Sequence, residues 1–214
     1  MTGLNLEREL GNVTYVDVSK VKEGGICPCC GKPALTVKRG IEVGNIFQLG
    51  TKYTESMNMQ FADKEGTLHH PIMGCYGIGV GRLAASICEA KHDDYGPIWP
   101  ISVAPWEVHL CCLRPDDEET KKVADTLYEE LQKNGVEVIY DDREGIRGGQ
   151  MFADADLIGA PIRVVVSPRN LKENKLEIST RDKSLSEMVE VTEGLVFILG
   201  LKQTLFQRIA DNVQ

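Results

Sequence analysis

The stretch GCYGIGVGRL, residues 74–83, places four glycines and an arginine where a strand passes into a helix. Glycines at such a junction either allow positive φ angles or let another group approach the backbone closely. A helix N-terminus favours anions and disfavours cations, so Arg82 stands at the unfavourable end of its helix. A phosphate group between the sheet and the Arg82 guanidinium would account for both features. The alternative is that Arg82 points into solvent and the glycines serve tight packing.

A second glycine-rich loop, DDREGIRGGQMF, places Arg143 and Arg147 ahead of a short helix. Guanidinium groups make a common base-specific contact with guanine edges. Phe152 could stack on an unpaired base, although packing in the core is the preferred interpretation. Asp154 could accept hydrogen bonds from bases or serve only as a capping residue. Arg163 starts a strand and is expected to reach the same face.

The seven cysteines do not suggest a disulfide framework, because their number is odd and nothing indicates export. Cys27 and Cys30 have the two-residue spacing of a zinc knuckle. A structural zinc site needs four ligands, and no second pair with this spacing follows. We interpret the segment as a turn with reduced thiols, with zinc binding as the alternative. His109 alternates with apolar neighbours and is interpreted as a core or edge histidine with satisfied ring nitrogens.

Composition is that of a folded soluble protein, with 42% hydrophobic and 26% charged residues in 214. The net charge of −8 argues against indiscriminate binding of nucleic acid. No stretch approaches the roughly 20 apolar residues that span a bilayer, and the N-terminus lacks the pattern of a signal peptide. We expect a cytoplasmic protein without a membrane role.

The segment HDDYGPIWPISVAPWE, residues 92–107, is rich in proline and tryptophan and predicts a linker. The boundary between two domains is expected after residue 103, giving domains 1–103 and 104–214. Antiparallel strands and a helix over 82–92 are expected before it, with strands at 13–18, at 41–50 and twice within 57–78. Strands and helices alternate after it, as in an α/β domain with a parallel or mixed sheet. The expected helices are 117–134, 150–158 and one from Thr192.

The sequence IMGCYGIGVGRL resembles the third signature motif of class II aminoacyl-tRNA synthetases. In chain order, RGIEVGNIFQLGTKY, PIMGCYGIGVGRL, IWPISVAPWEVHL and DDREGIRGGQMFADADLIGAPIRVVVS are similar to the C-terminal portion of the bacterial prolyl-tRNA synthetase family. The resemblance implies part of the antiparallel catalytic sheet of a class II synthetase (an α+β fold). An α/β anticodon-binding domain with a mixed sheet would follow.

The same resemblance implies a proline–tRNA ligase, which forms prolyl-adenylate from proline and ATP with Mg²⁺ and transfers proline to tRNA(Pro). Arg82 would bind the ATP phosphates and stabilise the charge that develops during proline attack. Phe47 and Cys75 would border the proline. The residues implied in ATP binding are Glu42, Asn45, Gly77, Gly79, Gly81 and Arg82. No tightly bound cofactor is implied, and the full-length enzyme is expected to be a homodimer.

The residues implied in anticodon recognition are Arg143, Arg147, Phe152, Asp154 and Arg163. The chain departs from the family at two points. Asn45 replaces a usual histidine, which puts any contact of that histidine in doubt. The DDREGIRGGQMF loop holds one extra residue, which could shift Arg147 relative to RNA.

Two earlier class II motifs, including one with a second ATP-binding arginine, are not recognisable before residue 40. The expectation is therefore a fragment that retains part of the ATP site and does not form prolyl-adenylate alone. The competing hypothesis is a stand-alone, non-catalytic tRNA-binding module derived from a synthetase.

Overall fold

The computed structural model describes residues 8, 11–12, 14 and 20–211. The chain divides into two compact units, Met1–Glu42 and Val43–Gln214. Apart from residue 14, the strand expected over 13–18 lies outside the described residues. The expected boundary after residue 103 falls inside the second unit, after a two-stranded pair that ends at Pro97 and before a five-stranded sheet that begins at Val108, and stays a prediction.

The first unit contains a tight hairpin around the cysteine-rich turn. Ile26 and Pro33 form an isolated antiparallel bridge. Next to it, the Cys27 N–H donates to the Lys32 carbonyl oxygen at 2.9 Å, and the Gly31 N–H donates to the Cys27 carbonyl oxygen at 2.8 Å. Gly31 has a φ of +68°, a left-handed conformation that favours glycine. These contacts close the chain into a single turn over residues 27–31.

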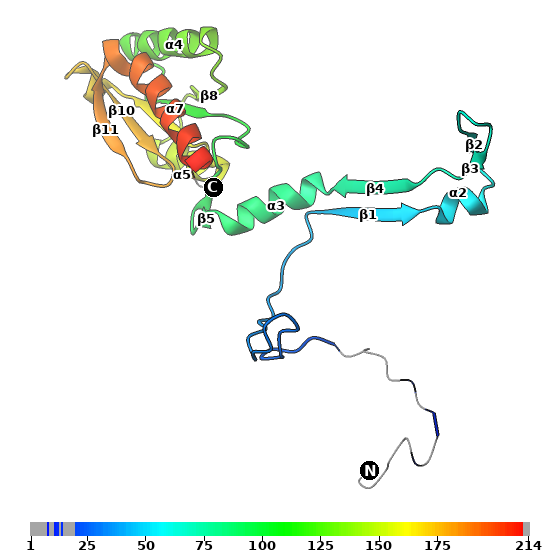
Figure 1. Cartoon of the computed structure of the whole chain (residues 1–214). Coiled ribbons are helices and arrows are strands. Elements are labelled where there is room, and N and C mark those ends of the chain that lie inside the picture. The colour runs from blue at the N-terminus through cyan, green and yellow to red at the C-terminus, as the bar shows by residue number, and fades with distance from the viewer. Residues whose placement is uncertain (1–7, 9–10, 13, 15–19, 212–214) are drawn as a thin grey trace. The chain divides into compact units, whose positions relative to one another are not determined.

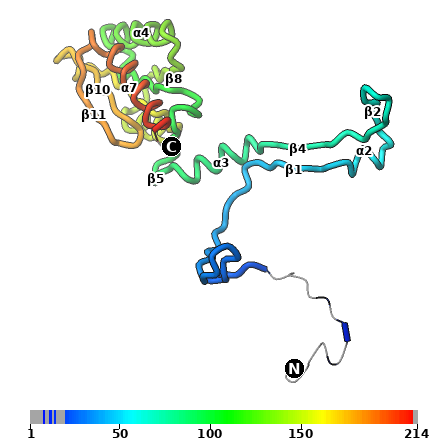
Figure 2. The backbone as a smooth tube through the Cα atoms, in the orientation of Figure 1, coloured from blue at the N-terminus to red at the C-terminus, as the bar shows by residue number. Residues whose placement is uncertain are grey.

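The second unit begins with a long antiparallel strand pair, β1 and β4, that leads into helix α3 (Figures 1 and 2). A small β2–β3 pair and the short helix α2 lie at the end of this pair remote from α3 (Figure 2). The bounds are β1 Gly44–Gly50, α2 Lys52–Ser56, β2 Phe61–Ala62, β3 Leu68–His69, β4 Met73–Ile78 and α3 Val80–Ala90. The antiparallel prediction is confirmed, although residues 57–78 form three strands rather than two.

A two-stranded pair, β5 (His92–Asp93) with β6 (Gly96–Pro97), precedes a five-stranded sheet in the order β11-β10-β9-β7-β8. Strand β7 runs parallel to both β8 and β9, whereas β10 runs antiparallel to β9 and β11. The sheet is therefore mixed, as predicted. The bounds are β7 Val108–Cys112, α4 Glu118–Lys133, β8 Val138–Asp141, α5 Gly148–Ile158, β9 Ile162–Val166, α6 Pro168–Leu171, β10 Lys175–Thr180, β11 Ser186–Glu190, a 3₁₀ turn Val191–Glu193 and α7 Gly194–Asp211.

Helices cover both faces of this sheet. Alternate residues of β7 and β9, such as Leu110 and Val164, pack in one core with α4 and α7 and are fully buried. The residues between them, such as Cys111 and Val165, pack on the opposite face against Ala155 of α5. Both faces of β7 are thus buried, which explains why its residues are apolar except for His109. Among the described residues, no helix has the length and apolar character needed to cross a bilayer.

Candidate functional site

The first candidate site lies on the β1–β4 pair. In its register Asn45 is opposite Gly77, and Phe47 is opposite Cys75. Residues directly opposite each other, and residues two apart on a strand, share one face of a sheet. The structure therefore brings four residues with implied nucleotide and proline contacts to one face. Glu42, which was grouped with them, belongs to the first unit.

Gly79 and Arg82 stand where β4 passes into α3. The Gly79 N–H donates to the Val43 carbonyl oxygen at 2.9 Å, which extends the strand pairing up to the helix. A Cβ atom on Gly79 would lie 3.4 Å from the Arg82 Cβ and 3.9 Å from its Nε. The Arg82 side chain therefore folds back over Gly79, in the direction usual for helical side chains. It lies beside a first turn of α3 that has no acidic residue and favours an anion.

The glycines of this junction do not adopt unusual backbone angles. None of Gly77, Gly79 and Gly81 has a positive φ, so the close-approach explanation remains. A Cβ on Gly81 would meet no described atom within 4 Å, and one on Gly77 would meet only the Asn45 Oδ1 at 4.0 Å. All three glycines are exposed. Their missing side chains leave the backbone open to a bound group.

The remote end of the strand pair depends on a threonine that sequence analysis missed. Thr54 of α2 is only 1% exposed. Its hydroxyl lies 2.9 Å from the Pro71 carbonyl oxygen and 3.1 Å from the Thr51 carbonyl oxygen. This contact ties α2 to the segment just before β4. Nothing in the spacing of Thr51 and Thr54 revealed a partner 17 residues away.

The second candidate site is centred on α5 and the loop before it. The Arg143 guanidinium donates to both carboxylate oxygens of Asp141 at 2.8 Å and to Asp154 Oδ2 at 2.7 Å. This contact with Arg143 lowers the pKa of the buried Asp141 carboxyl. The two carboxylates raise the pKa of Arg143 further above its ordinary value. Two residues that were expected to read bases therefore lie in direct contact with each other.

Phe152 and Arg163 form a stacked pair on the same face. The Arg163 guanidinium carbon lies 5.1 Å from the centre of the Phe152 ring, a cation–π contact. Phe152 is half-buried and packs against the Cys111, Ala155 and Val165 cluster, in agreement with the preferred core interpretation. Arg163 also donates through Nη1 to Asp156 at 3.1 Å, and it is only 27% exposed.

Arg147 differs from these neighbours because its side chain is exposed and makes no internal polar contact with the described residues. It occupies the N-cap position of α5, where its carbonyl oxygen accepts hydrogen bonds from the Gln150 and Met151 N–H groups. Within the described parts of the chain, its guanidinium has no ion pair or hydrogen bond. Of the arginines grouped around this loop, it is the one whose guanidinium is available to a ligand without breaking an internal contact.

His109 is buried, but its ring nitrogens are not satisfied as expected. It is 1% exposed, and neither ring nitrogen has a hydrogen-bond partner among the described residues. Burial lowers the pKa of His109, and the Asp141 carboxylate partly opposes this effect. Strand β7 therefore holds a neutral imidazole between the sheet and α5.

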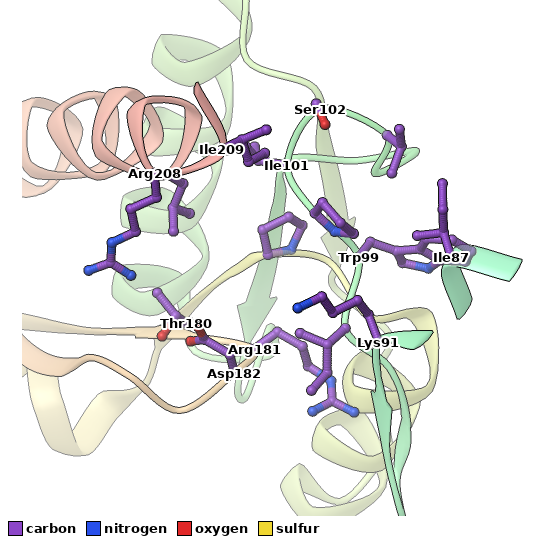
Figure 3. A pocket seen from close by; sticks show the side chains of 15 residues that line it. Ile87, Lys91, Trp99, Ile101, Ser102, Thr180, Arg181, Asp182, Arg208 and Ile209 are labelled. Atoms are coloured by element: carbon purple, nitrogen blue, oxygen red, sulfur yellow. The ribbon is translucent and has the colours of Figure 1, made fainter. Parts of the chain in front are cut away.

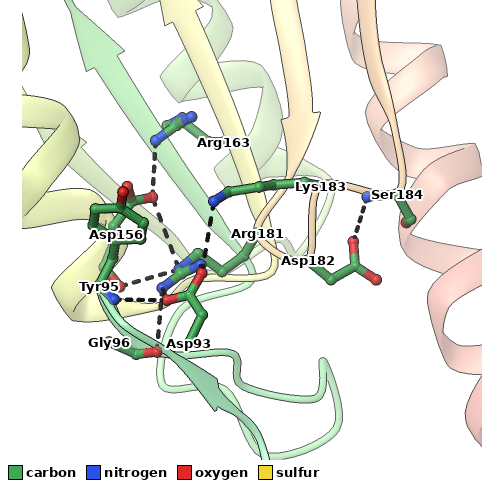
Figure 4. A network of polar contacts seen from close by, with 9 residues as sticks. All are labelled: Asp93, Tyr95, Gly96, Asp156, Arg163, Arg181, Asp182, Lys183 and Ser184. Carbon is green, nitrogen blue, oxygen red and sulfur yellow. Dashed lines mark hydrogen bonds and ion pairs between the residues drawn. The ribbon is translucent and has the colours of Figure 1, made fainter.

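A network that sequence analysis did not predict joins the β5–β6 pair to the end of α5 (Figure 4). Arg181 is 5% exposed and donates to both Asp93 carboxylate oxygens, at 2.7 and 2.8 Å. It also donates to the carbonyl oxygens of Asp156 and Gly96, at 3.1 and 3.2 Å. The Arg181 side chain is the main reason that the pKa of Asp93 is well below its usual range. Because Arg181 and Asp93 are 88 residues apart, their spacing carried no signal.

A cavity of about 750 Å³ lies in the second unit beside the last turns of α3 and α7 (Figure 3). Its lining is mainly apolar, with Ile87, Trp99, Ile101 and Ile209 among its members. No residue assigned to either candidate site lines it. It therefore adds nothing to the nucleotide or anticodon assignments.

All seven cysteines carry free thiols. Among the described residues, no group of three or more histidine, cysteine or acidic side chains is arranged to hold a metal ion. The structure therefore offers no complete zinc site at Cys27 and Cys30.

Comparison with known proteins agrees with this arrangement. Residues 17–91 match the tRNA synthetase class II core domain (G, H, P, S and T), and residues 107–201 match an anticodon binding domain. The proline–tRNA ligase of Caldicellulosiruptor bescii is 46% identical over 87% of this chain and 32% of its own length. Those of Aquifex aeolicus and Magnetococcus marinus are 46% and 42% identical, over 91% and 99% of this chain and 34% and 35% of their lengths.

The fold is also that of a solved structure, prolyl-tRNA synthetase from Cryptosporidium parvum complexed with L-proline and AMP. The TM-score is 0.68 at 22% identity, over 78% of this chain and 34% of that chain. These matches first define the class, because the chain holds part of the core domain and the anticodon-binding domain of a class II aminoacyl-tRNA synthetase. Within that class it is similar to the prolyl-tRNA synthetases, and it spans about a third of the length of the curated relatives it matches.

Proposed function

We propose that this chain contributes to the attachment of proline to tRNA(Pro), supplying part of the ATP and proline site and the anticodon-binding domain. One observation carries the proposal. The β1–β4 register places Asn45, Phe47, Cys75 and Gly77 on one face, and Arg82 lies at the adjoining helix start. The resemblance assigns ATP and proline to this face. The activity belongs to the cytoplasm and, in the whole enzyme, to a homodimer.

In this proposal Arg82 and the first N–H groups of α3 bind the ATP phosphates together. A carboxylate oxygen of proline attacks the α-phosphate, pyrophosphate leaves, and the arginine stabilises the negative charge that develops. The uncovered glycine backbone provides the floor for the nucleotide. Mg²⁺ would enter as the ATP complex.

Catalysis by the 214-residue chain alone is tested by proline-dependent exchange of pyrophosphate into ATP. The β1–β4 pair is exposed on both faces, with Phe47 at 52% exposure on the proposed nucleotide face and Ile46 at 85% on the other. A bound nucleotide would remain in contact with water, which weakens electrostatic stabilisation. We therefore expect no exchange above the blank. Exchange that Arg82→Ala abolishes would contradict this expectation.

Anticodon recognition is assigned mainly to Arg147, with Arg143, Phe152, Asp154 and Arg163 forming the surface around it. The exposed Arg147 guanidinium can reach guanine edges without losing an internal ion pair. Arg147→Ala should weaken binding of tRNA(Pro) about tenfold, the size of one base-specific contact. Arg169→Ala is the matched control, since Arg169 is an exposed arginine of α6 outside this face.

Binding is measured by titrating each chain with tRNA(Pro). The same titration should include a tRNA(Pro) variant whose anticodon guanines are replaced. Wild-type chain should prefer the natural tRNA, and Arg147→Ala should lose most of that preference. Equal affinity of the wild-type chain for both RNAs would exclude base-specific recognition. Specific tRNA binding without pyrophosphate exchange is expected under this proposal and also under a second candidate function, a stand-alone tRNA-binding module, which the complete buried core of the five-stranded domain supports. The upstream coding sequence separates the two, because an in-frame motif with the second ATP-binding arginine would favour the enzyme and its absence would favour the module.

A further inference from the structure

The cysteine-rich turn of the first unit places two thiols within reach of each other. The Gly31 N–H donates to the Cys27 carbonyl oxygen, which closes a five-residue α-turn over 27–31. In a tight turn, Cα atoms three residues apart lie within about 7 Å, and a disulfide bond spans Cα separations up to about 7 Å. Cys27 and Cys30 therefore satisfy the distance requirement for a disulfide without a change of the backbone fold.

The groups of the turn around Cys27 favour its thiolate form. The pKa of Cys27 is lowered chiefly by the backbone N–H groups of Cys30 and Cys29, and further by the Cys30 thiol. Cys27 is half-buried, and Cys29 and Cys30 are exposed, so small molecules can reach the turn. A thiolate stabilised in this way, beside a second thiol, is the arrangement of a reactive Cys-x-x-Cys pair.

We propose that Cys27 and Cys30 form a thiol–disulfide exchange site that reacts with low-molecular-weight disulfides such as oxidised glutathione. The Cys27 thiolate attacks one glutathione sulfur, so that a Cys27–glutathione disulfide forms and one glutathione thiolate leaves. The Cys30 thiol then loses its proton to solvent and attacks the Cys27 sulfur, which releases the second glutathione. The two cysteines lose two electrons in total, and the glutathione disulfide gains them.

The hairpin around the turn is the reason to expect an intraloop product rather than a lasting glutathione adduct. The Ile26–Pro33 bridge and the hydrogen bond between Cys27 and Lys32 hold the ends of the turn together. The second attack is intramolecular, so its effective concentration is high. Cys75 offers the internal comparison, because it is exposed on strand β4 and the nearest cysteine in the sequence is Cys88.

The test incubates the reduced, full 214-residue chain in glutathione redox buffers, blocks the remaining thiols by alkylation and maps peptides by mass spectrometry. The wild-type chain should yield a Cys27–Cys30 disulfide at potentials where Cys75 carries at most glutathione. Cys29→Ser should behave like the wild type. Cys30→Ser should accumulate glutathione on Cys27, because the resolving thiol is missing, and Cys27→Ser should lose both products.

Three results would overturn the proposal. The first is recovery of unoxidised Cys27 and Cys30 in buffers that modify Cys75. The second is formation of the same disulfide by a urea-unfolded chain at an equal potential, which would show that the turn contributes nothing. The third is purification of the chain with zinc bound in a Cys27- and Cys30-dependent manner, which would assign the turn to metal binding.

Discussion

His109 shows how one buried side chain can influence the stability of the sheet. Both of its ring nitrogens and the Arg163 Nε lack hydrogen-bond partners among the described residues. Both residues line a cavity of about 20 Å³ together with Asp156 and Thr180. A space of this size and polarity fits one water molecule, which would satisfy groups that are costly to leave unpaired. Burial of His109 lowers its pKa and so favours the neutral imidazole in the folded chain.

Stability should depend on pH through His109. The pKa of His109 in the folded chain lies below its ordinary value of 6.5, so the unfolded chain takes up a proton first as pH falls. The stabilisation is complete above about pH 6.5 and is lost as pH falls toward the lowered folded pKa, at up to about 1.4 kcal/mol per pH unit. Urea unfolding between pH 7 and 5 measures this slope.

In that experiment His109→Leu should be less dependent on pH than the wild type, because the titrating group is gone. His92→Leu is the control, since His92 is exposed and its substitution should keep the wild-type slope. Equal slopes for His109→Leu and the wild type would show that His109 does not titrate with unfolding.

Helix α5 connects the proposed anticodon face to the β5–β6 pair through its two ends. Its first residues follow Arg147, and its last turn packs on β6. Gly159 ends the helix with a φ of +76°, and a Cβ atom there would lie 2.4 Å from the Pro97 carbonyl oxygen. Backbone approach this close requires glycine, and together with the Arg181 network it fixes the C-terminal end of α5.

Gly159→Ala should therefore destabilise the chain by about 2 kcal/mol or more, from strain at positive φ and the clash with Pro97. Gly149→Ala lies in the first turn of the same helix, where φ is not positive and a Cβ meets no described atom within 4 Å. It should be neutral or stabilising by up to about 1 kcal/mol, because alanine is the better helix former. Urea unfolding of the two variants and wild type measures both effects. Similar losses in both variants would contradict the close packing at Gly159.

Elements with a strong local pattern were predictable from sequence, and those without one were not. Helix α4 begins after an Asp117 cap that accepts the Thr120 N–H and ends before Gly135, as its sequence indicates. Strand β11, SEMVE, was missed because it is short and mostly exposed at the sheet edge. The junction of glycines and Arg82 could also be predicted, because its unusual residues lie next to one another in the sequence. The pairing of Arg143 with Asp154 was not, because sequence spacing does not report contacts between elements.

The second unit contains two substructures that differ greatly in how much of their surface is buried. The five-stranded sheet has helices on both faces and residues such as Leu110 and Val164 at 0% exposure. The β1–β4 pair has exposed residues along both strands, including Ile46 and Tyr76. A two-stranded pair alone is marginally stable in water, because it buries little apolar surface. The chain therefore contains a self-sufficient domain and a segment whose stability requires further contacts.

Hydrogen–deuterium exchange of the 214-residue chain should separate these two parts. Amides of β1 and β4 should exchange rapidly, since local opening of that pair costs little, whereas amides of β7 and β9 should exchange only with global unfolding. Mild urea should abolish residual protection of β1 and β4 while β7 and β9 remain protected. Equal protection of all four strands, lost together in urea, would mean that the strand pair shares the cooperative unit of the five-stranded sheet. In that case its exposed face would have to be covered in solution, by self-association detectable as a concentration-dependent mass in analytical ultracentrifugation.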